Sequence, residues 1–127
     1  MTSVPEFFER FPASPVSSAE FVAVLDDRTR PIVTVLFLWG DDCPNCDVAK
    51  RAMLLHQAKF IWPGVRWLHC NVYEDPAMAT RFSLHGVPVF MVFRGTKSSG
   101  RMTGWPGIDR FAMAIEKELA MAGQDAG

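Results

Sequence analysis

The longest apolar stretch of the chain runs from Ile32 to Trp39 and is interrupted only by Thr34. Branched and aromatic residues occupy both alternating sets of positions, which is typical of a strand buried centrally in a sheet. Residues 40–42 break this run. From Pro44 onward, apolar residues recur at helical spacing until Pro63 and the glycine after it stop the pattern. The sequence therefore predicts a core strand that leads directly into a helix.

The remaining pattern adds one short helix before this unit and a series of elements after it. Ser17 with Glu20 three residues later forms a capping box, which predicts a helix that ends near Asp27. The later segments are predicted as a strand over Val65–Val72, a helix over Pro76–Ser83, a strand over Val87–Phe93, a polar turn over Arg94–Gly100, an antiparallel strand over Arg101–Thr103 and a helix from Asp109 to about Met121. Together they predict an α/β fold with a central mixed sheet of about four to five strands and helices on both faces.

The length and composition of the chain predict one globular domain. It has 127 residues, of which 49% are hydrophobic, and this is enough for a single buried core. We expect an N-terminal arm over residues 1–16, the domain over residues 17–122 and a flexible tail over residues 123–127. The arm carries Phe7, Phe8 and Phe11, which we expect to cover an exposed edge of the core. The alternative is that they form a dimer contact, but we expect a monomer.

The charge balance argues against several classes of partner. Thirteen basic and fourteen acidic side chains nearly cancel, so no strong field attracts nucleic acid or an anionic membrane. The apolar run at Ile32–Trp39 is far shorter than the roughly 20 residues that cross a bilayer. The segment Met1–Arg10 lacks the basic start and apolar stretch of a secretory signal. We therefore expect a cytoplasmic protein, or a periplasmic one if a leader has been removed.

The three cysteines form a close pair, Cys43 and Cys46, and a distant third, Cys70. Cys43 lies where the core strand passes into a helix, and the unpaired N–H groups at a helix start favour a thiolate. Pro44 suits the first helical position because no N–H is needed there. The pair can thus supply a nucleophile and a resolving thiol. The alternatives are an inert pair or half of a metal site, but closed zinc sites usually need four ligands, so we expect no metal.

Four motifs in order along the chain resemble the thioredoxin superfamily, and the resemblance extends from about Phe21 to Leu119. They are Phe37-Leu38-Trp39, Cys43-Pro44-Asn45-Cys46, Gly86-Val87-Pro88 and Gly104. The resemblance implies a thioredoxin fold in which Val87-Pro88 carries a cis-proline beside the dithiol and binds an extended substrate peptide. It also implies that Trp39, Pro44 and Gly104 lie around this substrate groove.

Some residues depart from the typical thioredoxin pattern. Asp42 stands directly before Cys43, where a tryptophan is typical, and Pro44-Asn45 between the cysteines is closer to the order found in glutaredoxins. Phe37 replaces a buried aspartate that helps to move the proton of the second cysteine. His69 replaces a nearby lysine, and its ordinary pKa near 6.5 suits proton transfer to or from Cys46.

These residues predict a thiol:disulfide oxidoreductase that needs no cofactor other than its own Cys43–Cys46 disulfide. The expected partners are protein or small-molecule disulfides and dithiols, with an upstream reductase as electron donor. Two alternatives remain: a thioredoxin-fold binding module with little turnover, and a glutathione-dependent, glutaredoxin-like reductase. We expect Cys70 to be a core residue. The direction of electron flow is left open.

Overall fold

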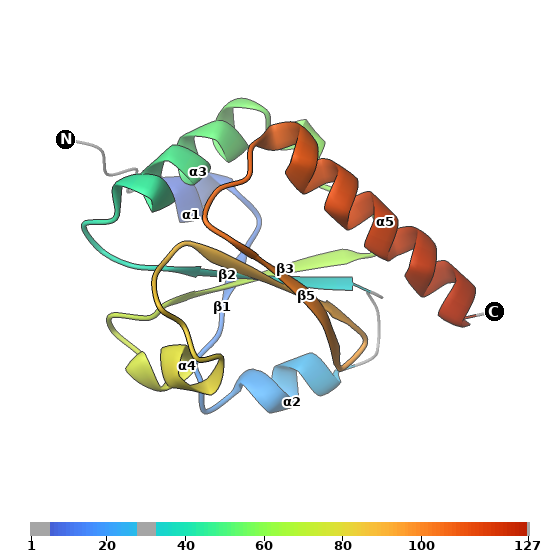
Figure 1. The fold of residues 1–127 in the computed structure, drawn as a ribbon, viewed down its shortest axis with the longest axis horizontal. Coiled ribbons are helices and arrows are strands. Elements are labelled where there is room, and N and C mark those ends of the chain that lie inside the picture. The colour runs from blue at the N-terminus through green and yellow to red at the C-terminus, as the bar shows by residue number, and fades with distance from the viewer. Residues whose placement is uncertain (1–5, 28–32, 127) are drawn as a thin grey trace.

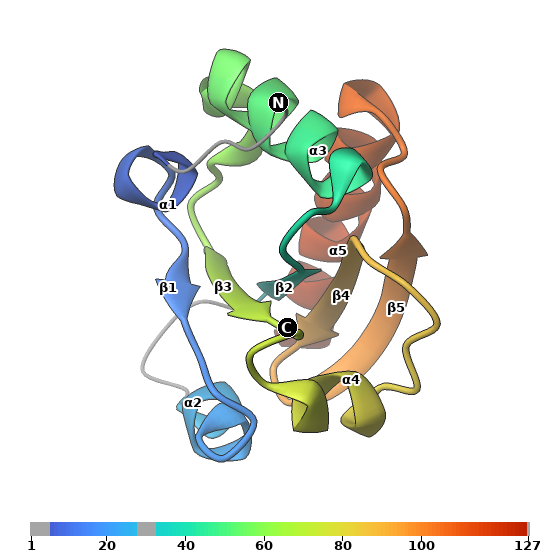
Figure 2. The same ribbon diagram turned by 90° about the vertical axis from the view of Figure 1, so that its left-hand side faces the viewer.

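The structure is a computed structural model that describes residues 6–27 and 33–126. Five strands form one sheet in the order β1-β3-β2-β4-β5. Their bounds are β1 Ser14–Pro15, β2 Val33–Trp39, β3 Val65–Asn71, β4 Val89–Arg94 and β5 Lys97–Thr103. The first three in this order run parallel, whereas β4 is antiparallel to β2 and β5 is antiparallel to β4. Figure 2 shows β1 at one edge and β5 at the other.

Helices cover both faces of the sheet, as Figure 1 shows. Their bounds are α1 Phe7–Arg10, α2 Phe21–Asp26, α3 Pro44–Leu55, α4 Pro76–Arg81 and α5 Ile108–Ala126. The helices α1, α3 and α5 lie on one face, and α2 and α4 lie on the other. The predicted fold class, a thioredoxin-like mixed sheet between helices, is confirmed.

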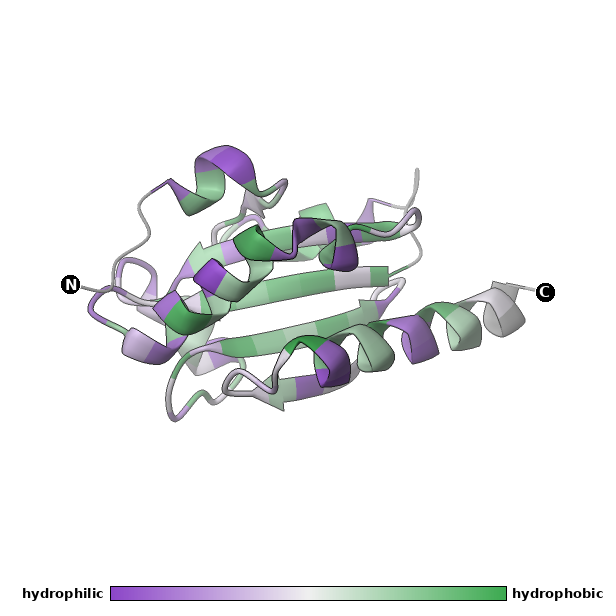
Figure 3. Ribbon diagram, turned by 90° about the horizontal axis from the view of Figure 1, so that it is seen from above, coloured by the Kyte–Doolittle hydropathy of each residue, from purple (hydrophilic) through white to green (hydrophobic). Residues whose placement is uncertain are grey.

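The strand β2 is the centre of the core because side chains on both its faces are buried. Val33, Val35 and Phe37 contribute to the apolar cluster beneath α1, α3 and α5. Leu36 and Leu38 contribute to a second cluster beneath α2 and α4. The central strands are accordingly the most hydrophobic part of the ribbon in Figure 3, and α5 alternates hydrophobic with polar residues. This is the arrangement that the unbroken apolar run predicts.

Several predicted boundaries differ from the structure. The helix α3 ends at Leu55, and a separate 3₁₀ turn over Gln57–Phe60 follows, so the predicted continuous helix is wrong there. The strand β5 begins at Lys97 rather than Arg101 because Gly95, at φ +60°, closes a tighter turn. The helix α5 continues to Ala126, beyond its expected end near Met121.

The N-terminal arm contains two elements that the pattern does not predict, α1 and β1. Phe7 and Phe11 of this arm are buried and stack on each other with ring centroids 5.0 Å apart. The strand β1 pairs in parallel with Leu68 and His69 of β3. Phe7 and Phe11 therefore cover the core beside α3, as the lid interpretation expects, and β1 adds an edge strand to the sheet from within the expected arm. The predicted start of β2 at Ile32 lies outside the described residues.

Candidate active site

The sequence forms the dithiol at the point where β2 passes into α3. Cys43 is the N-cap residue of α3, and its Sγ accepts a hydrogen bond of 3.1 Å from the backbone N–H of Cys46. Pro44 occupies the first turn, as predicted. Cys43 and Cys46 form a disulfide, with their Cα atoms 5.2 Å apart. An N–H group at a helix start thus points at the sulfur that would carry a thiolate.

The two sulfurs differ in their access to solvent. Cys43 keeps 7% of its surface exposed, whereas Cys46 is completely buried. Pro44 and Asp42, on either side of Cys43, are both exposed. An incoming substrate would therefore reach Cys43 first, as its expected role as nucleophile requires.

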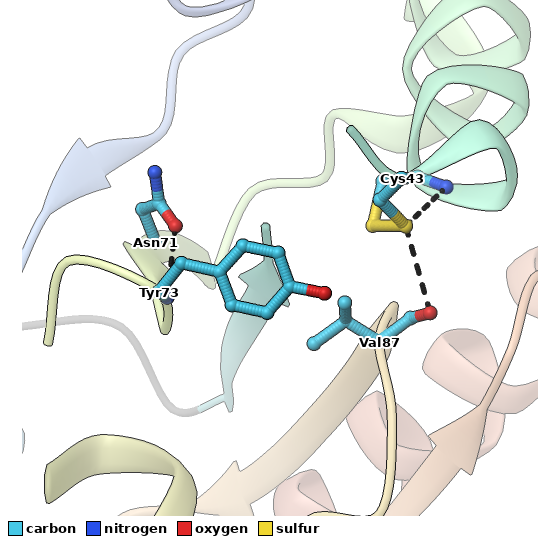
Figure 4. The surroundings of a disulfide bond; sticks show 5 residues. Cys43, Asn71, Tyr73 and Val87 are labelled. Carbon is cyan, nitrogen blue, oxygen red and sulfur yellow. Dashed lines mark hydrogen bonds between the residues drawn. A yellow bond between two sulfur atoms is a disulfide. The ribbon is translucent and has the colours of Figure 1, made fainter. Parts of the chain in front are cut away.

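The loop before β4 brings Val87 and Pro88 against Cys43. The Val87–Pro88 peptide bond is cis, as the resemblance implies. The carbonyl oxygen of Val87 lies 3.6 Å from the Sγ of Cys43, as Figure 4 shows. Gly104 donates its N–H to the carbonyl of Pro88 at 2.8 Å and has a φ of +82°, in the left-handed region. Four predicted site residues, Cys43, Val87, Pro88 and Gly104, are thus brought together.

An aromatic side chain that the sequence analysis does not identify, Tyr73, lies beside this group. Figure 4 shows its hydroxyl end directed toward Val87 and the disulfide. Its backbone N–H donates to the side-chain oxygen of Asn71 at 3.0 Å, and its ring packs so closely on Gly40 that an added Cβ there would approach it within 2.9 Å. With 61% of its surface exposed, Tyr73 forms part of the rim around the disulfide.

Trp39 and His69 form a second group, on the α3 face of the sheet. The indole N–H of Trp39 donates to Nδ1 of His69 at 3.2 Å. The imidazole stacks on the ring of Phe8 with 3.7 Å between centroids. Burial, together with the positive charge of Lys50, lowers the pKa of His69 to about 4. His69 is therefore neutral at pH 7 with its proton on Nε2, because Nδ1 accepts from Trp39. Its proposed role in proton transfer stays a prediction.

Lys50 of α3 joins this second group and was not identified from the sequence. Its side chain is buried, and its Nζ lies 3.9 Å from the centre of the Trp39 ring and 5.2 Å from that of Phe8. Burial lowers the pKa of Lys50, and the carboxylates of Asp47 and Asp41 partly oppose this shift. The only sequence signal for Lys50 is its position four residues after Cys46.

The third cysteine lies on the other face of the sheet. Cys70 is buried in the cluster under α2 and α4, and its sulfur lies 4.0 Å from a carboxylate oxygen of Asp75. Burial, with the negative charges of Asp75 and Glu74, raises the pKa of this thiol to about 11. Cys70 is thus a protonated core residue at neutral pH, as expected.

Two further residues lie next to the groove residues in the chain: Trp105 follows Gly104, and His85 precedes Gly86-Val87. Trp105 packs against Phe60, Phe90 and Phe111, so it supports the core. His85 is exposed in the loop before Val87.

Within residues 6–27 and 33–126, no three His, Cys, Asp or Glu side chains gather as a metal site would require. No helix in the same part of the chain is long and apolar enough to cross a membrane.

The fold and this geometry define a class: the chain is a thioredoxin-fold protein with a C-x-x-C disulfide at the start of a helix. It is similar to the thioredoxin-like protein YusE of Bacillus subtilis (strain 168), with 30% identity over 71 residues. This match covers 56% of the chain and 65% of YusE, slightly less than two thirds of that relative's length. No family model matches the chain.

Solved structures give the same fold. Thioredoxin from Trypanosoma brucei brucei has a TM-score of 0.71 at 18% identity, covering 87% of this chain and 95% of its own. Thioredoxin f2 from Chlamydomonas reinhardtii has a TM-score of 0.69 at 18% identity, covering 84% and 95%. The predicted thioredoxin fold is therefore confirmed.

Proposed function

We propose that this protein is a thiol:disulfide oxidoreductase that works through the Cys43–Cys46 pair. The observation that carries the proposal is the position of the disulfide, at the first turn of α3 with the N–H of Cys46 donating to the Sγ of Cys43. This arrangement favours a thiolate on the more accessible sulfur. The thioredoxin fold and the similarity to a thioredoxin-like relative support the same class of activity.

The reaction uses two exchanges of disulfide bonds. In the reducing direction, the Cys43 thiolate attacks a substrate disulfide, which forms a mixed disulfide and releases one substrate thiol. Cys46 then attacks the Cys43 sulfur, closes the Cys43–Cys46 disulfide and releases the second substrate thiol. Two electrons pass from the protein to the substrate. The reverse sequence oxidises a substrate dithiol. In both directions the Cys43–Cys46 pair carries the electrons without an added cofactor.

A groove for substrate follows from the loop beside Cys43. The carbonyl of Val87 lies beside the Cys43 sulfur, and the space next to Gly104 is open, since a Cβ there would meet no atom within 4 Å. An extended peptide can form hydrogen bonds with the backbone groups of such a segment. Tyr73 points toward Val87 in Figure 4, and Pro44 is exposed next to Cys43. We propose that both residues border this groove, together with Trp39 at the end of β2. We propose that protein disulfides bind here, with the cis Val87–Pro88 segment as their main contact.

The proposed partners are disulfides or dithiols on proteins or small molecules and an upstream reductase that renews the dithiol. We propose a monomer that acts in the cytoplasm. The charge balance of the chain gives no reason to expect nucleic acid as a partner.

Reduction of insulin by dithiothreitol, followed as turbidity, tests the proposal. We expect the wild-type protein to accelerate precipitation and Cys43→Ser to fall to the rate of the buffer blank. Cys70→Ser is the matched control, since it removes a thiol without touching the pair, and we expect it to keep most of the wild-type rate. Equal rates for wild type and Cys43→Ser would contradict the proposal.

A second candidate is a thioredoxin-fold binding module with little turnover. It is favoured by Phe37, which stacks on Phe90 with 4.8 Å between ring centroids where typical thioredoxins carry a proton-moving aspartate. The same assay separates the two, because a binding module would leave the insulin rate at the blank while its disulfide still forms.

A further inference from the structure

Lys50 is a buried charge on the active-site helix, and the reaction described above does not account for it. Only 6% of its surface is exposed, although lysine is almost never fully buried unless it is paired. It follows Cys46 by four residues in α3, so the two side chains share one face of the helix. Lys50 therefore lies on the same face of α3 as Cys46, one helical turn further along.

The surroundings of Lys50 hold its ammonium group in place. The Nζ lies over the Trp39 ring, and ring faces attract cations. Trp39 is the last residue of β2, immediately before the short loop that leads to Cys43. Its indole N–H is committed to His69, which fixes the plane of the ring. The Phe8 ring of α1 lies 5.2 Å from the same Nζ and 5.0 Å from the Trp39 ring, so the two neighbouring rings face the cation together.

The charged and titratable groups around Lys50 decide which charge it carries. Asp47 and Asp41 favour the ammonium form, and burial opposes it. His69, the remaining titratable side chain of this group, is neutral at pH 7 because its pKa is lowered to about 4. The aromatic faces of Trp39 and Phe8 also favour the cation. The neighbouring carboxylates and ring faces thus act against the lowering of the Lys50 pKa by burial.

A nearby positive charge would favour the resolving step, because Cys46 attacks in it as a thiolate. Cys46 is completely buried, and burial disfavours a thiolate unless an opposite charge lies nearby. Phe37 offers no acidic or basic group on the neighbouring strand. We propose that Lys50 is a positioning residue for the resolving step, whose ammonium group stabilises the Cys46 thiolate as it attacks the mixed disulfide. This inference rests on the proposed oxidoreductase function.

In this step, Cys46 loses its proton to solvent and its sulfur forms a bond to the Cys43 sulfur. The bond between Cys43 and the substrate sulfur breaks, and the substrate leaves as a thiolate that takes a proton from solvent. The substrate sulfur is reduced and the Cys46 sulfur is oxidised. Lys50 neither gains nor loses a proton.

The two steps can be separated with 5,5′-dithiobis(2-nitrobenzoate) on the reduced protein. Attack by Cys43 releases one thionitrobenzoate, and attack by Cys46 on the resulting mixed disulfide releases a second. We expect Lys50→Met to slow the second release about tenfold, as an increase of one unit in the pKa of Cys46 would do, and to leave the first release within about twofold. The pH midpoint of the second release should rise by about one unit.

Three variants control this experiment. Lys50→Arg keeps the charge, so we expect it to restore most of the second-step rate. Lys59→Met removes an exposed lysine from the 3₁₀ turn, and we expect wild-type rates in both steps. Because Asp47 and Asp41 interact with Lys50, and removing one partner of a buried charge pair is destabilising, we expect Lys50→Met to unfold more easily than wild type, and urea unfolding is measured beside the rates. Lys50→Gln serves the same test if the methionine variant does not fold.

An unchanged second-step rate and pH midpoint in Lys50→Met would overturn the inference. A slowing that Lys50→Arg does not relieve, in a variant with lowered stability, would also overturn it, because the lysine would then be only structural. Failure of the wild-type protein to release a second thionitrobenzoate would instead contradict the proposed function. The two failures are therefore distinguishable.

Discussion

A buried cysteine lies on each side of the sheet. Cys46 belongs to the helix α3 on one side, and Cys70 of β3 faces the side covered by α2 and α4. Both are almost inaccessible, with 0% and 4% of their surface exposed. Cys46 shares a helix start with Cys43 and a helix face with the cation of Lys50. Cys70 lies beside the carboxylate of Asp75 in an apolar cluster. Burial does not distinguish the two regions, but the charge and the backbone groups around the sulfur do.

This difference separates a reactive thiol from an inert one within a single fold. The helix start directs N–H groups toward sulfur, which favours the thiolate that attacks disulfides. Around Cys70, burial together with the negative charges of Asp75 and Glu74 has the opposite effect and raises the pKa of the thiol to about 11. We therefore expect a buried cysteine of this fold to react where N–H groups or positive charges face its sulfur, and to remain inert where negative charges do.

The largest expected effect is in the rate of alkylation. In the reduced native protein at pH 7, we expect iodoacetamide to modify Cys43 readily. A pKa of about 11 leaves roughly one Cys70 molecule in 10⁴ as thiolate at this pH. Peptide mass spectrometry with timed quenching would measure both rates. Comparable rates for Cys43 and Cys70 in the native protein would contradict the comparison. As a control, both cysteines should be labelled equally in denaturant.

Removal of Phe8 tests whether the arm supports the region around Lys50. The Phe8 ring stacks on His69 and faces the cation of Lys50, and it is half-buried. We expect Phe8→Ala to lower the free energy of unfolding by about 2 kcal/mol, below the 3–5 kcal/mol that a fully buried phenylalanine costs. Urea unfolding would measure it, with the exposed Met113→Ala on α5 as control. A loss no larger than that of the control would show that the arm is dispensable.

The pH dependence of stability tests the burial of His69. Its pKa is about 4 in the folded protein against 6.5 when unfolded, so between these values the unfolded chain binds more protons. Stability is therefore complete above about pH 6.5 and falls as the pH decreases toward 4. We expect this histidine to account for about 1 to 2 kcal/mol, a figure reduced for its partial exposure. Urea unfolding at several pH values should show a flatter profile for His69→Gln, and parallel profiles would contradict the expectation.

The smallest expected effect concerns the rim of the disulfide. A Cβ on Gly40 would approach the Tyr73 ring within 2.9 Å, and this exposed ring can swing away. We expect Gly40→Ala to change the free energy of unfolding by about 0.5 kcal/mol or less. The KM for insulin should rise severalfold, while the rate with a small disulfide should stay constant. Tyr73→Ala should reproduce this pattern if the ring contacts the substrate, and an unchanged KM in both would exclude such a contact.

The sequence predicts the fold and the dithiol because their signals are local. The apolar run of β2, the loop after it and Pro44 together define a strand followed by a helix start, and Cys43 lies between them. The capping-box pattern is also local: Ser17 and Glu20 form hydrogen bonds with each other, but the helix α2 begins only at Phe21, with Glu20 rather than Ser17 as its N-cap. Such features depend on neighbouring residues and can be read without knowledge of the packing.

The surroundings of the dithiol depend on contacts between residues far apart in the chain. In the sequence, Lys50 is an ordinary polar position of a helix. Only the folded structure brings the Phe8 ring of α1 within 5.2 Å of its ammonium group. Tyr73 reaches the rim only because β3 pairs with β2, which sets Asn71 opposite Trp39. The four-residue helix α1 is too short for a periodic signal. These residues could not be assigned to the site from spacing alone.

The reduction potential of the Cys43–Cys46 pair, measured by equilibration with glutathione and intact-mass detection, tests the central claim most directly. We expect a reversible two-electron transition that Cys43→Ser abolishes and Cys70→Ser preserves. A potential near −270 mV would mark a reductant and one near −120 mV an oxidant. A pair that forms no reversible disulfide at any glutathione ratio, or a transition that moves to Cys70, would contradict the account.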